Sequence, residues 1–160
     1  MTFSCTAPAE NTPKKPTGLI NKKTAIQYEK NYVDHQYKYI NQYVNKNLGK
    51  NSTEKFKDHR EVFFTLENLE NYLAYVKKAS KEKGYQGLGI RIYFGAKKGA
   101  DSLYKSTVFL SPTHQSSVNK PSKNAIKNSF YTAKERPINS TDIDALNYGS
   151  SGEPDNYNGN

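Results

Sequence analysis

The stretch from Val62 to Thr113 constrains the fold most, because it has the pattern of a strand, a helix and two further strands. The run Val62-Phe63-Phe64 is short and apolar, which is typical of a covered strand. Thr65 follows with a hydroxyl that can accept a hydrogen bond from a free amide at a helix start, and Gly84 suits a helix end. Between them lie apolar residues at helical spacing, which we expect to be buried: Leu69, Tyr72, Leu73, Val76 and Ala79.

Two strands are predicted after this helix. Every second residue from Leu88 to Phe94 is large and apolar, which is the period of a strand with one buried face. Val108 and Leu110 repeat the pattern. We expect an antiparallel hairpin whose connection, Gly95 to Lys105, is longer than a tight turn requires.

An earlier helix is predicted from Thr24 to about Leu48, with Gly49 just past its end. At the helical spacing, one set of apolar residues falls within ~80° of arc and should face the core. This set is Ile26, Val33, Tyr37, Ile40, Val44 and Leu48.

The same helix carries a second aromatic stripe on nearly the opposite face. Tyr28, Tyr32, Tyr39 and Tyr43 form it, and Lys46 lies at its border. One interpretation is that the C-terminal arm or a second protomer covers these rings while their hydroxyls reach water. The other is an exposed platform beside lysines, suited to stacking bases or binding a partner.

The distribution of apolar residues predicts one domain with polar ends. Apolar residues are 34% of the chain, below the ~45–50% of a typical globular domain, and both ends are rich in polar residues and proline. We therefore expect an α+β domain at residues 21–113, with a small, mainly antiparallel sheet and two helices packed on one face. Residues 1–20 are expected to be a disordered N-terminal arm, and residues 114–160 a polar C-terminal arm that docks in places.

Positive charge is concentrated in the N-terminal part of the chain. The net charge is +9, and residues 1–60 hold 11 Lys and Arg against 5 Asp and Glu. Residues 114–160 are balanced at 5 against 5. Such a field favours an anionic partner, such as nucleic acid, a membrane surface or an acidic protein. The alternative is a lysine-rich surface that serves solubility alone.

The single cysteine, Cys5, excludes an intrachain disulfide and a cysteine-based metal site. A small residue before Cys5 and a proline-rich stretch after it resemble the end of a bacterial lipoprotein signal and its tether. The basic and apolar parts of such a signal do not precede Cys5. As written, the chain is expected to be cytoplasmic, without a transmembrane segment. The alternative is a lipid anchor at Cys5 in the cell envelope, with the true start of the protein upstream.

The predicted hairpin carries candidate anion-binding residues at two places. In the connection, glycines can expose backbone amides, and Lys97 and Lys98 add positive charge, without the spacing of a P-loop. Arg91 lies in mid-strand beside Tyr93, where a charged side chain needs a partner if it is covered. The alternatives are a plain exposed loop and an arginine on the solvent face of the sheet.

Recognisable catalytic chemistry is absent from the sequence. His35, His59 and His114 lack the spacing of metal ligands. Ser111 is near His114, but no nucleophile elbow is present. We therefore assign no catalytic residue, metal site or cofactor.

The central region resembles a known family. The lysine-bearing helix, then Gly89-Ile-Arg-Ile-Tyr-Phe-Gly95 and Thr107-Val-Phe-Leu-Ser-Pro-Thr113, is similar to a family of small uncharacterised bacterial proteins. The resemblance covers roughly the central third of the chain. The family has no known activity, so the resemblance implies no function. The segment from Leu146 to Pro154 resembles the Pro- and Cys-containing tail of that family but lacks its cysteine.

These observations predict a non-catalytic binding or interaction module of unknown ligand. Its working surface would be the basic, tyrosine-rich face of the first helix, continued by Arg91, Tyr93 and the hairpin connection. The expected partner is a protein or another anionic molecule. The first alternative is a nucleic-acid-binding protein that uses the same lysines and tyrosines, although no RRM, KH or helix-turn-helix signature is present. The second is a tethered cell-envelope lipoprotein.

Overall fold

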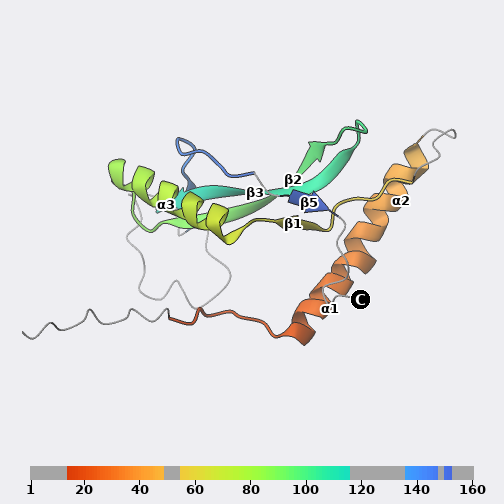
Figure 1. The fold of residues 1–160 in the computed structure, drawn as a ribbon, viewed down its shortest axis with the longest axis horizontal. Helices are drawn as coiled ribbons and strands as arrows, with labels where there is room; N and C mark the ends of the chain where they lie inside the picture. The colour runs from red at the N-terminus through yellow and green to blue at the C-terminus, as the bar shows by residue number, and fades with distance from the viewer. Residues whose placement is uncertain (1–13, 49–54, 116–135, 148–149, 153–160) are drawn as a thin grey trace, which may run out of the picture.

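The computed structural model describes residues 14–48, 55–115, 136–147 and 150–152. It is an α+β protein, as the sequence predicts, with two helices and a small antiparallel three-stranded sheet. Figure 1 shows helix α3 (Leu66–Glu82) lying along the sheet and the other helix standing at the opposite end of the molecule. The strands are β1 (Glu61–Phe63), β2 (Gly89–Lys98), β3 (Tyr104–His114), β4 (Ile138–Asn139) and β5 (Ser150–Gly152).

The first helix begins and ends close to the predicted positions. It comprises α1 (Lys22–Tyr32), a π-helical segment η1 (Val33–Tyr37) and α2 (Lys38–Asn47), and we call the three together the long helix. The Asn21 side chain accepts a hydrogen bond from the Thr24 amide at 2.9 Å, which satisfies one free donor of the helix start. The long helix has no fully buried residue. The position of the long helix therefore depends on polar contacts with neighbouring segments rather than on a fully buried apolar stripe.

The sheet has the order β2-β3-β4, with both pairs antiparallel. β2 pairs with β3 along its whole length, from Gly89 opposite Thr113 to Lys98 opposite Tyr104. β1 pairs with β5 in a separate two-stranded sheet. The strands of the hairpin are longer than predicted, because pairing continues through Gly95 and Lys98 and leaves only residues 99–103 as the connection.

A small core lies between α3 and the sheet. Thr65 caps α3 by accepting a hydrogen bond from the Asn68 amide at 3.1 Å, as predicted. Tyr72 and Val76 of α3 pack with Leu110 of β3 and with Ile143. The predicted first strand is less covered than its composition suggests, because Phe63 is 61% exposed.

Residues 136–147 lie along the outer edge of β3. Leu146 exchanges two backbone hydrogen bonds with Leu110, at 2.8 and 2.9 Å, and the Ser140 amide donates to the Pro112 carbonyl at 2.9 Å. The Tyr72 hydroxyl donates to the Leu110 carbonyl at 2.8 Å and so joins α3 to the same edge. Ile143 enters the core from this segment, so residues beyond 113 complete the packing around α3.

Candidate functional site

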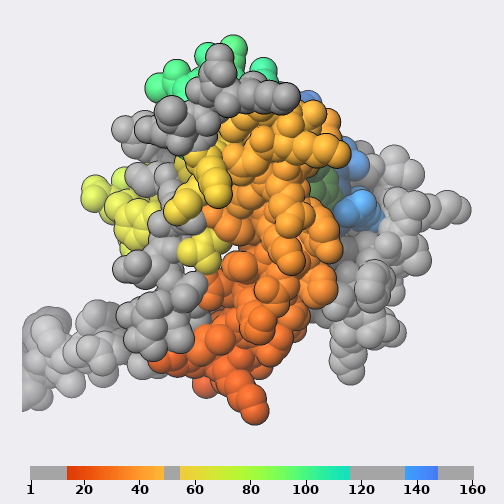
Figure 2. Space-filling model, turned by 90° about the vertical axis from the view of Figure 1, so that its right-hand side faces the viewer, coloured from red at the N-terminus to blue at the C-terminus, as the bar shows by residue number. Residues whose placement is uncertain are grey.

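Three of the four tyrosines of the predicted stripe are exposed. Tyr28 is 61% exposed, Tyr39 60% and Tyr43 73%, whereas Tyr32 is half-buried. The long helix faces the viewer along its length in Figure 2, at one end of the molecule. We call these three exposed rings, Tyr28, Tyr39 and Tyr43, the tyrosine platform.

The π-helical segment widens the arc that the four tyrosines cover. The Lys38 amide donates to the carbonyl of Val33, five residues back, so the turn holds one residue more than an α-helical turn. One extra residue rotates the following helix by roughly 100° relative to a continuous α-helix. Tyr39 is thereby turned to roughly 80° from Tyr28, with Tyr43 between them, and Tyr32 lies on the other side of Tyr28.

The same rotation builds a wall from residues four apart. In a continuous α-helix, positions four apart drift by ~40° per step, which is ~120° from Tyr28 to Ile40. The extra residue offsets most of this drift, so Tyr28, Tyr32, Gln36 and Ile40 all line one groove beside the sheet. The groove has a volume of about 530 Å³, and Phe94 of β2 lies on its other side. An adjoining hollow of about 260 Å³ extends from Tyr32 and Phe94 to residues 59–62.

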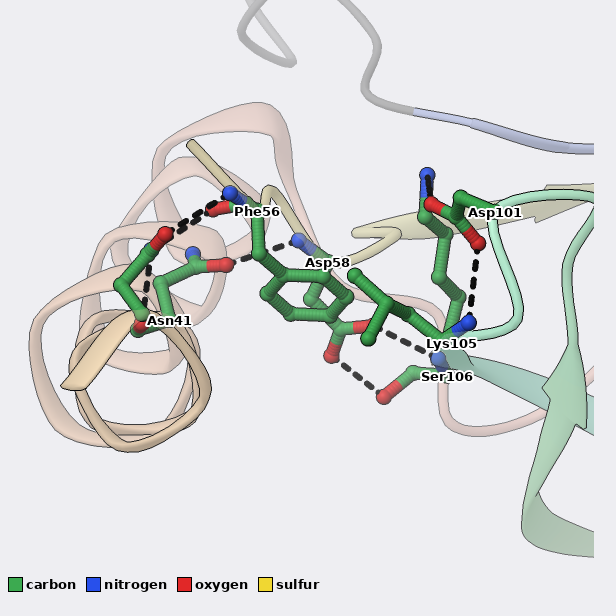
Figure 3. Close-up of polar contacts among 8 residues, drawn as sticks. Asn41, Phe56, Asp58, Asp101, Lys105 and Ser106 are labelled. Carbon is green, nitrogen blue, oxygen red and sulfur yellow. Dashed lines mark hydrogen bonds and ion pairs between the residues drawn. The ribbon is translucent and has the colours of Figure 1, made fainter. Parts of the chain in front are cut away.

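Two asparagines hold the long helix to the segment before β1. Asn45 accepts a hydrogen bond from the Phe56 amide at 2.8 Å and donates to the Phe56 carbonyl at 2.9 Å. Asn41, one turn earlier, accepts from the Asp58 amide at 2.8 Å. Figure 3 shows Asn41 on the side of the helix that faces the extended chain at Phe56 and Asp58. Backbone groups that a neighbouring strand would satisfy are thus satisfied by helix side chains.

Asp58 continues this connection to the sheet. Its carboxylate accepts hydrogen bonds from the amide and the hydroxyl of Ser106 in β3, at 2.6 and 2.5 Å, and the residue is 1% exposed (Figure 3). Burial, followed by the negative charge of Asp58, raises the pKa of the Tyr32 phenol, so this ring stays protonated at neutral pH. Ser106, which lines the groove, is therefore held in position by its buried contacts with Asp58. These contacts were not predicted from the sequence.

Arg91 and Tyr93 lie apart from the tyrosine platform and interact with β4 and with the residue just before it. The Arg91 guanidinium donates to the Asn139 side-chain oxygen at 2.5 Å and to the Pro137 carbonyl at 2.6 Å. Asn139 also donates to the Tyr93 hydroxyl at 2.7 Å, and this bond, with the Arg91 contact, lowers the pKa of Tyr93. The partner that a half-covered arginine needs is thus supplied by the chain itself.

Lys97 and Lys98 lie within β2 and not in a loop. Both side chains are exposed, and their backbones pair with Lys105 and Tyr104. The sequence predicted that glycines between Gly95 and Asp101 expose backbone amides to an anion. Gly95 does not lie in such a loop, because its backbone pairs with Thr107 of β3. Lys46 is exposed near the end of the long helix.

A serine–histidine hydrogen bond occurs where the sequence analysis did not expect one. His114 Nδ1 and Ser140 Oγ are 2.7 Å apart, and the His114 ring stacks on Tyr85 at 3.8 Å between centroids. Ser140 is only 1% exposed. A substrate cannot reach a hydroxyl so covered, so this pair joins β3 to the segment after β4 and does not form a nucleophilic site.

Two further features concern the described residues alone. No three His, Cys, Asp or Glu side chains among them lie close enough together to hold a metal ion. None of the helices described here is long and apolar enough to cross a membrane. Cys5, where the alternative interpretation places a lipid anchor, lies outside the described residues.

No protein-family model, curated protein or solved structure matches this chain. The resemblance to a family of small bacterial proteins therefore stays a prediction.

Proposed function

We propose that this protein is a non-catalytic binding module that holds a protein partner on the exposed tyrosine side of the long helix. The observation that supports the proposal best is the exposure of Tyr28, Tyr39 and Tyr43 at 60–73% on one helix. Tyrosine offers a large, rigid contact area with a polar end, and such rings are enriched at the centres of protein interfaces.

The charges of the long helix suit an acidic partner. Its two carboxylates are already in ion pairs, Asp34 with Lys30 at 2.6 Å and Glu29 with Arg60 at 3.4 Å. The other lysines of the helix form no ion pair within the described part of the chain: Lys22, Lys23, Lys38 and Lys46. Acidic side chains of a partner would therefore meet unpaired positive charge beside the rings.

The second candidate is a nucleic-acid-binding protein. Exposed tyrosines beside unpaired lysines also suit single-stranded nucleic acid, because bases stack on aromatic rings while lysines contact phosphates. This candidate predicts that affinity for short DNA or RNA falls steeply as the salt concentration rises.

Site-specific photocrosslinking separates the two candidates. A photoreactive phenylalanine analogue replaces Tyr39 or Tyr43 in the full chain, and Tyr104, which is 65% exposed at the hairpin end, serves as the control position. We expect an adduct from Tyr39 and Tyr43 that protease removes and nuclease does not, and no such adduct from Tyr104. An adduct removed by nuclease would support nucleic acid instead, and equal adducts from all three positions would contradict both candidates.

A further inference from the structure

The outer edge of β3 is occupied by hydrogen bonds that point away from β2. The Ser106 amide donates to Asp58, Leu110 exchanges two bonds with Leu146, and the Pro112 carbonyl accepts from Ser140. In an antiparallel pair, a residue whose backbone groups point outward lies opposite another that also points outward. The even-numbered residues of β3 are therefore the non-hydrogen-bonded positions of the hairpin.

The register then fixes which backbone groups β2 presents at its own outer edge. Ala96 lies opposite Ser106, Ile92 opposite Leu110 and Ile90 opposite Pro112. The amides and carbonyls of these residues, and of Phe94 between them, thus point away from β3. No strand pairs with this edge among the described residues. β2 therefore offers a row of donors and acceptors to an added strand.

The side chains beside this edge are apolar and exposed. Ile92 is 60% exposed and Phe94 90%, and both point to the same face as Leu110. Phe94 borders the groove whose other wall is Tyr28, Tyr32 and Ile40 of the long helix. Side chains of neighbouring strands lie about 5 Å apart on one face. An added strand would therefore place a side chain against Phe94, the residue of β2 that borders this groove.

The surrounding charge favours an acidic strand over a second copy of this chain. Lys97 and Lys98 are exposed at one end of β2, and the long helix carries unpaired lysines on its own surface. Two copies would bring together chains that each carry a net charge of +9. Like charges oppose such an approach, whereas a segment rich in Asp and Glu is attracted.

We propose that the free edge of β2 receives an extended acidic segment of a partner protein as an added strand, with one apolar side chain packed against Phe94. The inference rests on the proposed function in one respect, that the partner is a protein. The added strand satisfies the outward backbone groups of β2, and the apolar side chain covers Phe94.

Fluorescence anisotropy with a defined probe tests the inference. The probe is a labelled peptide of ten residues, the length of β2, in which Val and Glu alternate. We expect it to bind the full chain, and we expect the same peptide with Lys in place of Glu not to bind. In Ala96→Pro the outward amide is absent while the bonds to β3, which come from the odd-numbered residues, remain. We expect at least about a tenfold loss of affinity for this variant and for Phe94→Ser, and little change for Ala96→Val.

A second measurement covers the case in which Ala96→Pro does not fold by circular dichroism. The same peptide, methylated on alternate backbone nitrogens, should then fail to bind the unaltered protein, because it cannot pair with the edge. Equal binding of the methylated and unmethylated peptides would overturn the inference. So would a dimer in sedimentation that Ala96→Pro disrupts, since the occupant would then be a second copy.

The outcome can be separated from that of the proposed function. If the Val–Glu peptide does not bind while protein adducts form at Tyr39 and Tyr43, strand addition is wrong and the proposed function stands. If the peptide binds with the expected losses while no adduct forms, the β2 edge is the binding site and the tyrosine platform is not.

Discussion

Asp58 and Ser106 are joined by two hydrogen bonds, one from the Ser106 amide at 2.6 Å and one from its hydroxyl at 2.5 Å, across 48 residues of sequence. Asp58 is buried, and its own amide donates to Asn41 of the long helix. This residue therefore links the long helix, the segment before β1 and the edge of β3. Few apolar side chains are buried around it, so the link depends on polar contacts.

Replacement of Asp58 by Ala should destabilise the protein strongly. The Ser106 amide would be left buried without an acceptor, so we expect a loss of about 2–4 kcal/mol in the free energy of unfolding. Ser106→Ala removes only the hydroxyl bond and should cost about 1 kcal/mol. Urea denaturation of the three proteins measures both differences. Equal losses for the two variants would contradict the assigned role of the Ser106 amide.

Asn45→Ala should weaken the attachment of the long helix. The variant leaves both the amide and the carbonyl of Phe56 without their partner, at a cost of about 1–2 kcal/mol. Asn47→Ala is the matched control, since Asn47 is exposed and its amide bonds the Tyr43 carbonyl of the same helix. Both variants also lose a side-chain bond to the backbone carbonyl four residues back, so their difference isolates the Phe56 contact. Amide hydrogen exchange in residues 38–47 should accelerate in Asn45→Ala alone.

Deletion of His35 should convert the π-helical segment into an α-helix. The following helix would rotate by roughly 100°, which moves Asn41 and Asn45 away from the chain at Phe56. We expect unchanged helix content by circular dichroism together with a lower free energy of unfolding. His35→Ala keeps the residue count and should behave like the unaltered protein. A deletion variant of undiminished stability would show that the π turn does not set the position of α2.

The ion pair between Lys83 and Asp142 should make stability depend on pH. Lys83 lies 3.0 Å from Asp142 and Tyr85 donates to it at 2.8 Å, and together they hold the pKa of Asp142 below its usual value. A carboxyl group whose pKa is lower in the folded state adds stability at pH values above its unfolded pKa. This added stability is lost as the pH falls through the folded-state pKa. The difference in Tm between the unaltered protein and Asp142→Asn should therefore be constant near neutrality and shrink below about pH 4.

The stability that this ion pair contributes should also be lost at high pH. Asp142 raises the pKa of both Lys83 and Tyr85, so their contribution is present below their unfolded pKa values and disappears as the pH rises through the folded ones. Asp144→Asn is the control, because Asp144 forms no ion pair within the described residues. A difference in Tm for Asp142→Asn that persists at low pH would point to a cause other than charge.

The elements with local signals could be predicted from the sequence. Helix α3 is marked by Thr65, by Gly84 and by apolar residues at helical spacing, all within one segment. The hairpin is marked by alternation that each strand carries by itself. These signals need no knowledge of distant parts of the chain, so the α+β class followed from them.

The contacts that build the groove could not be predicted. Asp58 lies in a polar connector, and nothing near it in sequence indicates that Ser106 is its partner. Phe94 continues the alternation of Ile90 and Ile92 and was expected on a covered face, yet it is 90% exposed. The extra residue of the π turn leaves no mark in composition, so Tyr39 was placed with Tyr28. Each of these features depends on residues that are distant in sequence or on a change of helical phase.

The outer edge of β3 has a consequence for assembly. Leu146, Ser140 and β4 cover that edge in short, irregular pieces, whereas β2 offers ten residues in continuous register. A fibre of stacked sheets needs two complementary edges on every copy. Among the described residues, β2 is the only strand longer than three residues with an unpaired edge, so growth has no second long edge from which to continue. Association through β2 should therefore stop at a closed complex of defined size, even at high concentration.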